Sequence, residues 1–378
     1  MKAIYLDNAA TTMIDAEVLS VMHAASLENY GNPSSTHQFG RKAKTAIENV
    51  RKNIAGHFNV AASEIIFTSG GTEADNLILH NAVLNLGVQR IITSKIEHHA
   101  VLHTCEFLEK SQGIQLDFVD LDAQGNLDLH HLETLLATSD KKTLMSLMLI
   151  NNEIGNLLPV EEVCHLAIKY HALFHSDTVQ TIGHYPLDLQ QFSIDFIVAS
   201  AHKFHGPKGI GFAFFKKGFG VLPMFYGGNQ EKGARASTEN VAGILGMEKA
   251  LSIAIQNLEI DRNHILEIKK YFITELNHHF ENIHFNGFSA DESRSTYTIL
   301  NVRFPTKNDL LLFSLDMAGI AVSGGSACQS GSNKGSHVLA EILNDEEAKK
   351  TSVRFSFSKF TTKEEIDFTI VKLKELLK

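Results

Sequence analysis

The residues most clearly suited to a chemical reaction follow an apolar stretch near the middle of the chain. Ser-Ala-His-Lys at 200–203 follows the apolar residues 196–199 and precedes Gly-Pro-Lys-Gly at 206–209. Removal from water lowers the pKa of a lysine and frees its amine to form a Schiff base with a carbonyl compound. A solvated loop lysine is the common alternative, and Lys208 illustrates it. We therefore take Lys203 as a candidate nucleophile.

A second motif could hold an anion. Thr-Ser-Gly-Gly-Thr-Glu at 68–73 joins a β-rich stretch to a segment with helical composition. Glycines allow close approach of the backbone, and the free N–H groups of a first helical turn attract a phosphate. The motif lacks the lysine of a P-loop and the third glycine of a dinucleotide-binding turn. A plain turn with Thr72 as helix N-cap explains the pattern equally well.

An acid ends a further apolar stretch. Asp177 lies in Phe-His-Ser-Asp-Thr-Val-Gln at 174–180. A carboxylate at the end of a buried strand could pair with a cation. The ordinary explanation is an aspartate that caps a helix. Taken alone, the motif favours that ordinary explanation.

Cys328 lies in a Gly/Ser-rich stretch at 323–336 that has almost nothing to bury. Structural cysteines are usually buried, so this position indicates a reactive thiol. The other two cysteines, Cys105 and Cys164, are far away in sequence and form no C-x-x-C pair. Because no His/Cys spacing typical of zinc occurs either, we predict no metal site.

The composition restricts the classes of function. The chain has 378 residues, 44% of them hydrophobic and 20% charged, as in an ordinary globular protein of about two domains. A net charge of −9 without a basic run disfavours a nucleic-acid partner. No apolar leader and no apolar stretch of about 18 residues is present. With three scattered cysteines, these features predict a cytoplasmic protein without membrane contact.

The elements that must position these residues alternate between β-rich runs and helical stretches. Such alternation predicts an α/β fold with a mostly parallel sheet, whose ligand sites lie beyond the carboxyl ends of the strands. A long helical stretch is expected over about 241–276, followed by a smaller α+β unit. We expect a large domain over 15–260 and a small domain formed by 1–14 and 261–378.

Ten motifs in chain order carry a resemblance to a known family. They are YLDNAATT, GNPSSTH, TSGGTEADN, EH, NNEIG, HSDTVQ, SAHKFHGPKG, GGNQEKGARAST, SGGSAC and RFSFSKF. Their order and spacing, from Tyr5 to about Thr362, resemble those of the cysteine desulfurases of the NifS/IscS type, which are class-V aminotransferases. The resemblance implies a transferase of fold type I that depends on pyridoxal 5'-phosphate (PLP).

The resemblance also implies the residues that bind PLP. Lys203 would bind the cofactor as a Schiff base, Asp177 would pair with the ring nitrogen, and His98 would stack on the ring and exchange protons. Further contacts would come from Asn152 and Gln180 near the phenolate oxygen and from Gly71, Thr72, Ser200 and His202 around the phosphate. Thr238 would reach the phosphate from a second subunit, which implies a homodimer.

The implied substrate is L-cysteine. Arg354 would bind its carboxylate, with Asn152 nearby, because a guanidinium forms two parallel hydrogen bonds to a carboxylate. Cys328 would accept the sulfur as a persulfide and leave alanine. The sulfur would pass to an acceptor such as an iron–sulfur scaffold or a tRNA-thiolation protein.

Some features leave alternatives open. Ala201, Ser237 and Lys359 replace the commoner Gly, Gly and Arg, although none removes a reacting group. The long loop around Cys328 resembles the subgroup that hands sulfur directly to acceptors, whereas the early end at Lys378 puts scaffold docking in doubt. Another PLP lyase or aminotransferase of the same fold, for example one preferring selenocysteine, and a catalytically silent sulfur-trafficking scaffold are the alternatives. The Cys328 loop argues against the first, because transamination needs no exposed cysteine.

Overall fold

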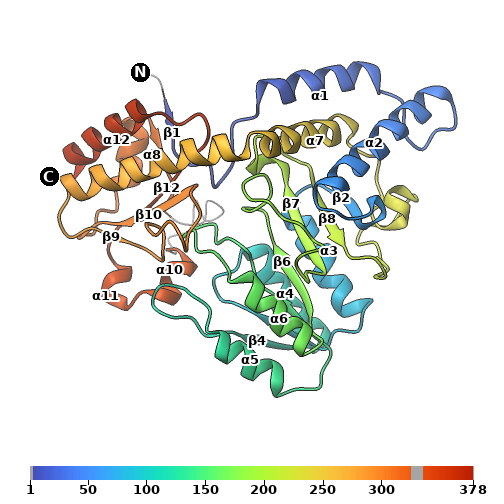
Figure 1. Ribbon diagram of the computed structural model, residues 1–378, viewed down its shortest axis with the longest axis horizontal. Coiled ribbons are helices and arrows are strands. Elements are labelled where there is room, and N and C mark those ends of the chain that lie inside the picture. The colour runs from blue at the N-terminus through green and yellow to red at the C-terminus, as the bar shows by residue number, and fades with distance from the viewer. Residues whose placement is uncertain (1–2, 325–334, 378) are drawn as a thin grey trace.

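The computed structural model describes residues 3–324 and 335–377 (Figure 1). Cys328 therefore lies outside the described residues. In the described part, no helix combines the length and apolar character needed to cross a membrane.

Seven strands form the central sheet, in the order β2-β8-β7-β6-β5-β3-β4. The strands are β2 (Ile65–Thr68), β3 (Arg90–Thr93), β4 (Gln115–Phe118), β5 (Thr143–Ser146), β6 (Leu173–Asp177), β7 (Phe196–Ser200) and β8 (Gly211–Phe215). Only β8 pairs antiparallel to its neighbours. The expected α/β fold with a mostly parallel sheet is confirmed.

Helices cover both faces of this sheet because its strands are apolar on both sides. The helices are α1 (Ala16–Glu28), α2 (Gln38–His57), α3 (Gly71–Leu84), α4 (His99–Gln112), α5 (Leu129–Ala137), α6 (Val160–Lys169) and α7 (Val241–Gln256). Alternate strand residues enter two separate cores: Phe67 and Phe212 pack with α2 and α7, whereas Ile66 and Ala213 pack with α3 and α4. The helices pack on the two faces of the sheet, so the ends of the strands remain available for a functional site.

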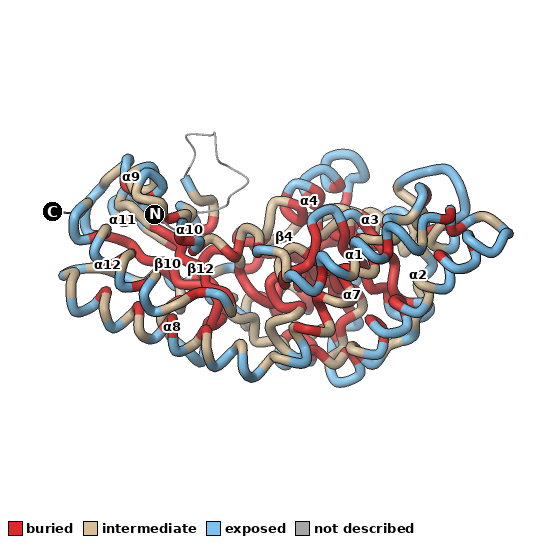
Figure 2. Tube along the Cα trace, turned by 90° about the horizontal axis from the view of Figure 1, so that it is seen from above, coloured by how far each residue is buried: buried red, intermediate tan, exposed pale blue. Residues whose placement is uncertain are grey.

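A smaller region follows in the chain and lies at the side of the molecule that holds both termini (Figures 1 and 2). It contains β9 (His284–Phe285), β10 (Ile299–Arg303), β12 (Ser352–Ser356), α8 (Leu258–His279), α9 (Leu311–Met317), α10 (His337–Ile342), α11 (Asp345–Ala348) and α12 (Lys363–Leu376). β1 (Ile4–Tyr5) joins it by parallel pairing with β11 (Ile320–Ala321). This region has its own apolar core around Phe272, Phe355 and Phe357. The domain boundaries given above stay a prediction.

The expected helical stretch over about 241–276 is present, but it consists of two helices. α7 ends at Gln256 and α8 begins at Leu258. Between them, Asn257 leaves the helical conformation (φ −103°, ψ 9°), and its backbone N–H and its side-chain amide both donate to the Ile253 carbonyl. An asparagine that satisfies the last carbonyls in this way ends a helix. The apolar periodicity continues across the break and conceals it from the sequence.

Candidate active site

A cavity of about 190 Å³ lies where the parallel strands end. Its walls come from the residues that follow β5, β6 and β7, from the first turn of α3, from His98 before α4, and from the N-terminal segment. The lining residues are Ala9, Ala10, Gly71, Thr72, Asp75, His98, Met148, Ile150, Asn152, Asp177, Val179, Gln180, Ser200, His202, Lys203 and Arg354. The lining includes residues that the sequence placed after apolar strands, and the sheet brings them together: Gly71, Thr72, Asp177, Gln180, Ser200, His202 and Lys203.

Lys203 is held within this cavity by backbone carbonyl groups. It ends the short 3₁₀ helix η2 (Ala201–Lys203) directly after β7. Its Nζ donates hydrogen bonds to the carbonyl oxygens of Ala9 (2.6 Å) and Ala10 (2.9 Å). His184 Nε2 lies 3.0 Å from the Lys203 carbonyl oxygen and fixes the backbone. The amine therefore faces the cavity, and Lys203 is not a solvated loop lysine.

The turn before α3 is shaped to admit a ligand close to the backbone. The N-cap is Gly70 with φ 153°, and no side chain caps the helix, so Thr72 is not the N-cap. A Cβ at Gly71 would lie only 2.7 Å from Val179 Cγ2. A glycine is thus required there by the close packing of Val179, which follows β6. The 14-residue helix α3 points the positive end of its dipole into the cavity beside Ser200.

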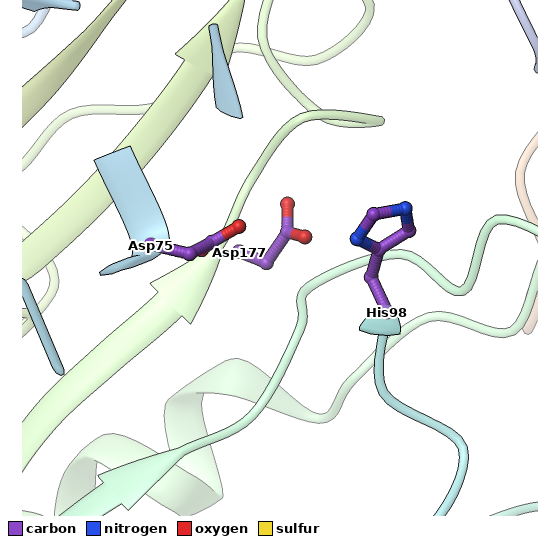
Figure 3. A group of neighbouring side chains, drawn as sticks. All are labelled: Asp75, His98 and Asp177. Carbon is purple, nitrogen blue, oxygen red and sulfur yellow. The ribbon is translucent and has the colours of Figure 1, made fainter. Parts of the chain in front are cut away.

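Three ionisable side chains meet at the back of the cavity. Asp177 ends β6 and lies between Asp75, from α3, and His98 (Figure 3). One ligand atom from each lies within 4.8 Å of the others. His98 Nδ1 accepts a hydrogen bond from the Ala100 N–H (3.1 Å), so a neutral His98 carries its proton on Nε2. Such a group could hold a cation only if both acids were ionised.

Burial opposes ionisation of both acids together. Asp75 is 1% exposed, and burial, with Asp177 and Glu97 close by, raises the pKa of Asp75 well above its usual value. Burial and Asp177 also raise the pKa of Glu97, although the Met148 N–H donates to Glu97 Oε1 (2.9 Å). Asp177 itself accepts from the Val179 N–H (2.9 Å) in a turn and caps no helix. The ordinary explanation for Asp177 therefore fails.

Arg354 enters the cavity from β12. It is only 1% exposed, so it is a buried residue. Its Nη2 donates to Asp7 Oδ1 (2.8 Å), and its Nη1 donates to the Asn152 carbonyl oxygen (2.7 Å). Among the buried atoms of the described residues, Arg354 Nε and Asn152 Oδ1 have no hydrogen-bond partner. Two unpaired polar atoms in one cavity are suited to a polar ligand.

Two further expected residues complete the wall. Gln180 Nε2 donates to the Ala9 carbonyl oxygen (3.0 Å). His202 Nδ1 lies 3.1 Å from Thr11 Oγ1. Burial, helped by the positive charges of Lys203 and Lys208, lowers the pKa of His202 to about 4. His202 is therefore neutral near pH 7 and can donate a hydrogen bond.

One predicted site residue, Thr238, does not line this cavity. Thr238 is exposed and lines a neighbouring cavity with Ser69 and Arg235. It was expected to act across a subunit boundary, and a single chain does not test that expectation. Cys328 lies outside the described residues. The residue before Thr238, Ser237, adopts φ 111°, a conformation that favours the glycine more common at that place.

Two residues of the site were not predicted from the sequence. Asp7 orients Arg354, and Asp75 faces Asp177. Asp75 could have been found, because it follows Gly71 by four residues and so shares the face of α3 that begins at the glycine turn. The pairing of Asp7 with Arg354 joins residues 347 positions apart, which no local pattern reveals.

Known proteins resemble the chain over its whole length. The profile of the aminotransferase class-V family matches residues 4–368. The cysteine desulfurase IscS of Dictyoglomus turgidum is 40% identical over 381 residues, which cover 100% of this chain and 95% of the relative. A solved structure described as a NifS-like protein is 35% identical with a TM-score of 0.90, covering 99% of each chain.

Two more solved structures agree with this assignment. The NifS-like protein of Rickettsia africae is 32% identical with a TM-score of 0.88 and covers 99% of each chain. A structure described as SspA in complex with cysteine is 29% identical with a TM-score of 0.81, covering 95% of this chain and 100% of the other. From the full-length matches and the shared fold, this chain belongs to the class-V aminotransferase family and, within it, to the cysteine desulfurases of the NifS/IscS type.

Proposed function

We propose that the chain is a PLP-dependent cysteine desulfurase that converts L-cysteine to L-alanine and carries the sulfur as a persulfide on Cys328. The observation that carries this proposal is the cavity itself. An amine at Lys203, an acid at Asp177, a glycine turn at the start of α3 and a guanidinium at Arg354 all line it. These are the groups that PLP and an amino-acid substrate require.

The residues present fit PLP. Lys203 Nζ provides the amine for the aldehyde carbon, and the N–H groups of the Gly71 turn, with Ser200 and His202, would hold the phosphate. Asp177 would face the ring nitrogen and His98 the face of the ring. The unpaired Asn152 Oδ1 supports a polar ligand atom beside it. Bound PLP would supply an electron sink that weakens the bonds at the α-carbon of an amino acid.

The substrate would be held by its carboxylate. Arg354 keeps one unpaired donor, Nε, while Asp7 and the Asn152 carbonyl fix the other end of the guanidinium. Because these contacts hold the guanidinium plane, a carboxylate meets it in one orientation. Lys203 Nζ would accept the α-proton, and His98 Nε2 would donate or accept a proton on the opposite side. A related structure is described as a complex with cysteine, which supports this substrate class.

Cys328 would perform the sulfur transfer. Its thiolate attacks the sulfur of L-cysteine, an S–S bond forms, and the Cβ–S bond breaks with its electron pair left on the carbon fragment. That fragment takes up protons and leaves as alanine, and Cys328 keeps the second sulfur. The persulfide would then pass to an acceptor, for which an iron–sulfur scaffold or a tRNA-thiolation protein is proposed. A cytoplasmic homodimer that places Thr238 at the partner's cavity belongs to the same proposal.

The test is to incubate the purified protein with PLP and L-cysteine and to measure alanine, sulfide and the mass of the Cys328 peptide. We expect one alanine per sulfur released and a mass increase of one sulfur on Cys328. Cys328→Ala should still bind PLP but should lose the persulfide and nearly all sulfide release. Sulfur release at the full rate from Cys328→Ala would contradict the proposal and favour a lyase of the same fold.

A further inference from the structure

Asp75 has no role in the reaction described so far, yet it lines the cavity. It is 1% exposed and projects from α3 toward Asp177 (Figure 3). A buried carboxyl group is costly unless it is paired or neutral. No basic side chain of the described residues forms an ion pair with Asp75 except His175, whose Nε2 lies 3.4 Å from Asp75 Oδ1.

His175 cannot supply the missing positive charge. It is fully buried on β6, and burial lowers its pKa to about 3. Its Nδ1 lies 2.8 Å from Ser146 Oγ. A neutral imidazole that accepts from the Ser146 hydroxyl at Nδ1 carries its proton on Nε2, toward Asp75 Oδ1. Asp75 therefore lies between a weak hydrogen-bond donor, His175 Nε2, and a second acid, Asp177.

Two carboxylates this close cannot both be ionised in a buried cavity. We propose that Asp75 is a positioning residue that holds a proton, so that the negative charge of the pair stays on Asp177, facing the cofactor. The chain Ser146–His175–Asp75 then forms a neutral polar wall that fixes the Asp177 side chain without competing for the ring nitrogen. This inference rests on the proposed PLP function, because the charge on Asp177 matters only if a cationic ring faces it.

The central experiment compares the same change at the two acids. Asp177→Asn removes the anion and should raise the dissociation constant of PLP by about tenfold or more. Asp75→Asn keeps a neutral polar group of the same shape and should change it by less than about threefold. Asp75→Leu removes the partner of His175 and the polar neighbour of Asp177, and should weaken PLP about tenfold and shift its absorption maximum. Asp75→Asn should thus retain the affinity for PLP that Asp75→Leu loses.

Two measurements on the cofactor-free protein separate this role from simple loss of folding. Thermal unfolding should give similar midpoints for Asp75→Asn and the wild type. Infrared spectra should show the carbonyl band of a protonated carboxylic acid in the wild type and in Asp177→Asn, and Asp75→Asn should remove it. Glu97→Gln is the matched control, because Glu97 is a second buried acid outside the cavity lining and can contribute only a separate band.

Three results would overturn the inference. Asp75→Asn could weaken PLP as strongly as Asp177→Asn, which would place charge on Asp75. Asp75→Leu could bind PLP like the wild type, which would remove any positioning role. The carbonyl band that remains in Glu97→Gln could survive Asp75→Asn. Failure of the wild type to bind PLP would instead overturn the proposed function, and the role of Asp75 with it.

Discussion

The cavity at the strand ends and the core of the smaller region treat buried polar groups in opposite ways. Around the cavity, Asn152 Oδ1 and Arg354 Nε are buried without a hydrogen-bond partner among the described residues. In the smaller region, Lys269 is also buried, at 2% exposed, but its Nζ donates to Ser295 Oγ (3.1 Å) and to the Thr296 carbonyl oxygen (2.6 Å). The unpaired polar atoms leave the cavity able to bind a polar ligand. The hydrogen bonds of Lys269 instead stabilise the smaller region.

The comparison shows that burial alone does not make a lysine reactive. Burial lowers the pKa of Lys269 to about 7, close to the range in which an amine can act as a nucleophile. Lys269 nevertheless lines none of the described cavities, whereas the half-buried Lys203 lines the cavity with Asp177 and Arg354. Lys203 and Lys269 therefore differ in whether a ligand can reach the amine.

The largest expected effect is the loss of catalysis in Lys203→Ala. The amine would both bind the cofactor and accept the α-proton. We expect the rate of alanine formation to fall by about a hundredfold to ten-thousandfold, as for loss of a general base. Steady-state assays with L-cysteine measure this rate.

Lys269→Met is the matched control for that prediction. It removes a buried amine from the other region and leaves the Thr296 carbonyl without its partner, so it should lower the free energy of unfolding by about 1–3 kcal/mol. The rate of alanine formation should stay unchanged. A rate that drops with Lys269→Met as it does with Lys203→Ala would remove the distinction between the two regions.

Phe272→Ala should cause the largest loss of stability. Phe272 is fully buried, and its ring packs edge-on against Phe355 at a centroid distance of 4.9 Å. Truncating a core phenylalanine costs about 3–5 kcal/mol. Denaturant unfolding should show this loss, while the dissociation constant of PLP at low temperature stays within about twofold of the wild type. Weakened PLP binding in the folded variant would show that the two regions are coupled.

Arg354→Lys should affect substrate binding alone. A lysine retains the positive charge but cannot hold the planar, multiply bonded arrangement with Asp7 and Asn152. Loss of one charge-assisted hydrogen bond costs about 1.5–3 kcal/mol, so KM for L-cysteine should rise about tenfold or more. The absorption spectrum of bound PLP should not change. An unchanged KM would exclude Arg354 from the carboxylate site.

The smallest expected effect, counted per pH unit, is a loss of stability in acid. Burial lowers the pKa of His202 and of His205 to about 4, below the usual value of 6.5. The unfolded chain then binds more protons than the folded chain between pH 6.5 and 4. Stability is therefore complete above pH 6.5 and falls toward pH 4, by at most about 1.4 kcal/mol per pH unit for each histidine. His205→Gln should flatten the slope in denaturant titrations, and an unchanged slope would contradict this assignment.

The sequence predicted best what depends on strand ends. Lys203, Asp177 and the Gly71 turn follow apolar runs, and parallel strands bring such positions to one edge of the sheet. Asp7 and Arg354 could not be paired in advance, because they lie 347 residues apart and only the folded small region brings Asp7 beside β12. The break between α7 and α8 at Asn257 was not predicted, because the apolar periodicity of the sequence continues through it. The role of Cys328 rests on the family resemblance, since that residue lies outside the described part of the chain.

The central claim is that the amine of residue 203 binds PLP. Borohydride reduction of the PLP-loaded protein fixes the cofactor to the amine that holds it, and peptide mass mapping then locates the label. The account predicts one pyridoxyl group per chain, on Lys203, and its disappearance in Lys203→Ala. A label on Lys208 or Lys269, or no label on a protein that still forms alanine from L-cysteine, would contradict the account.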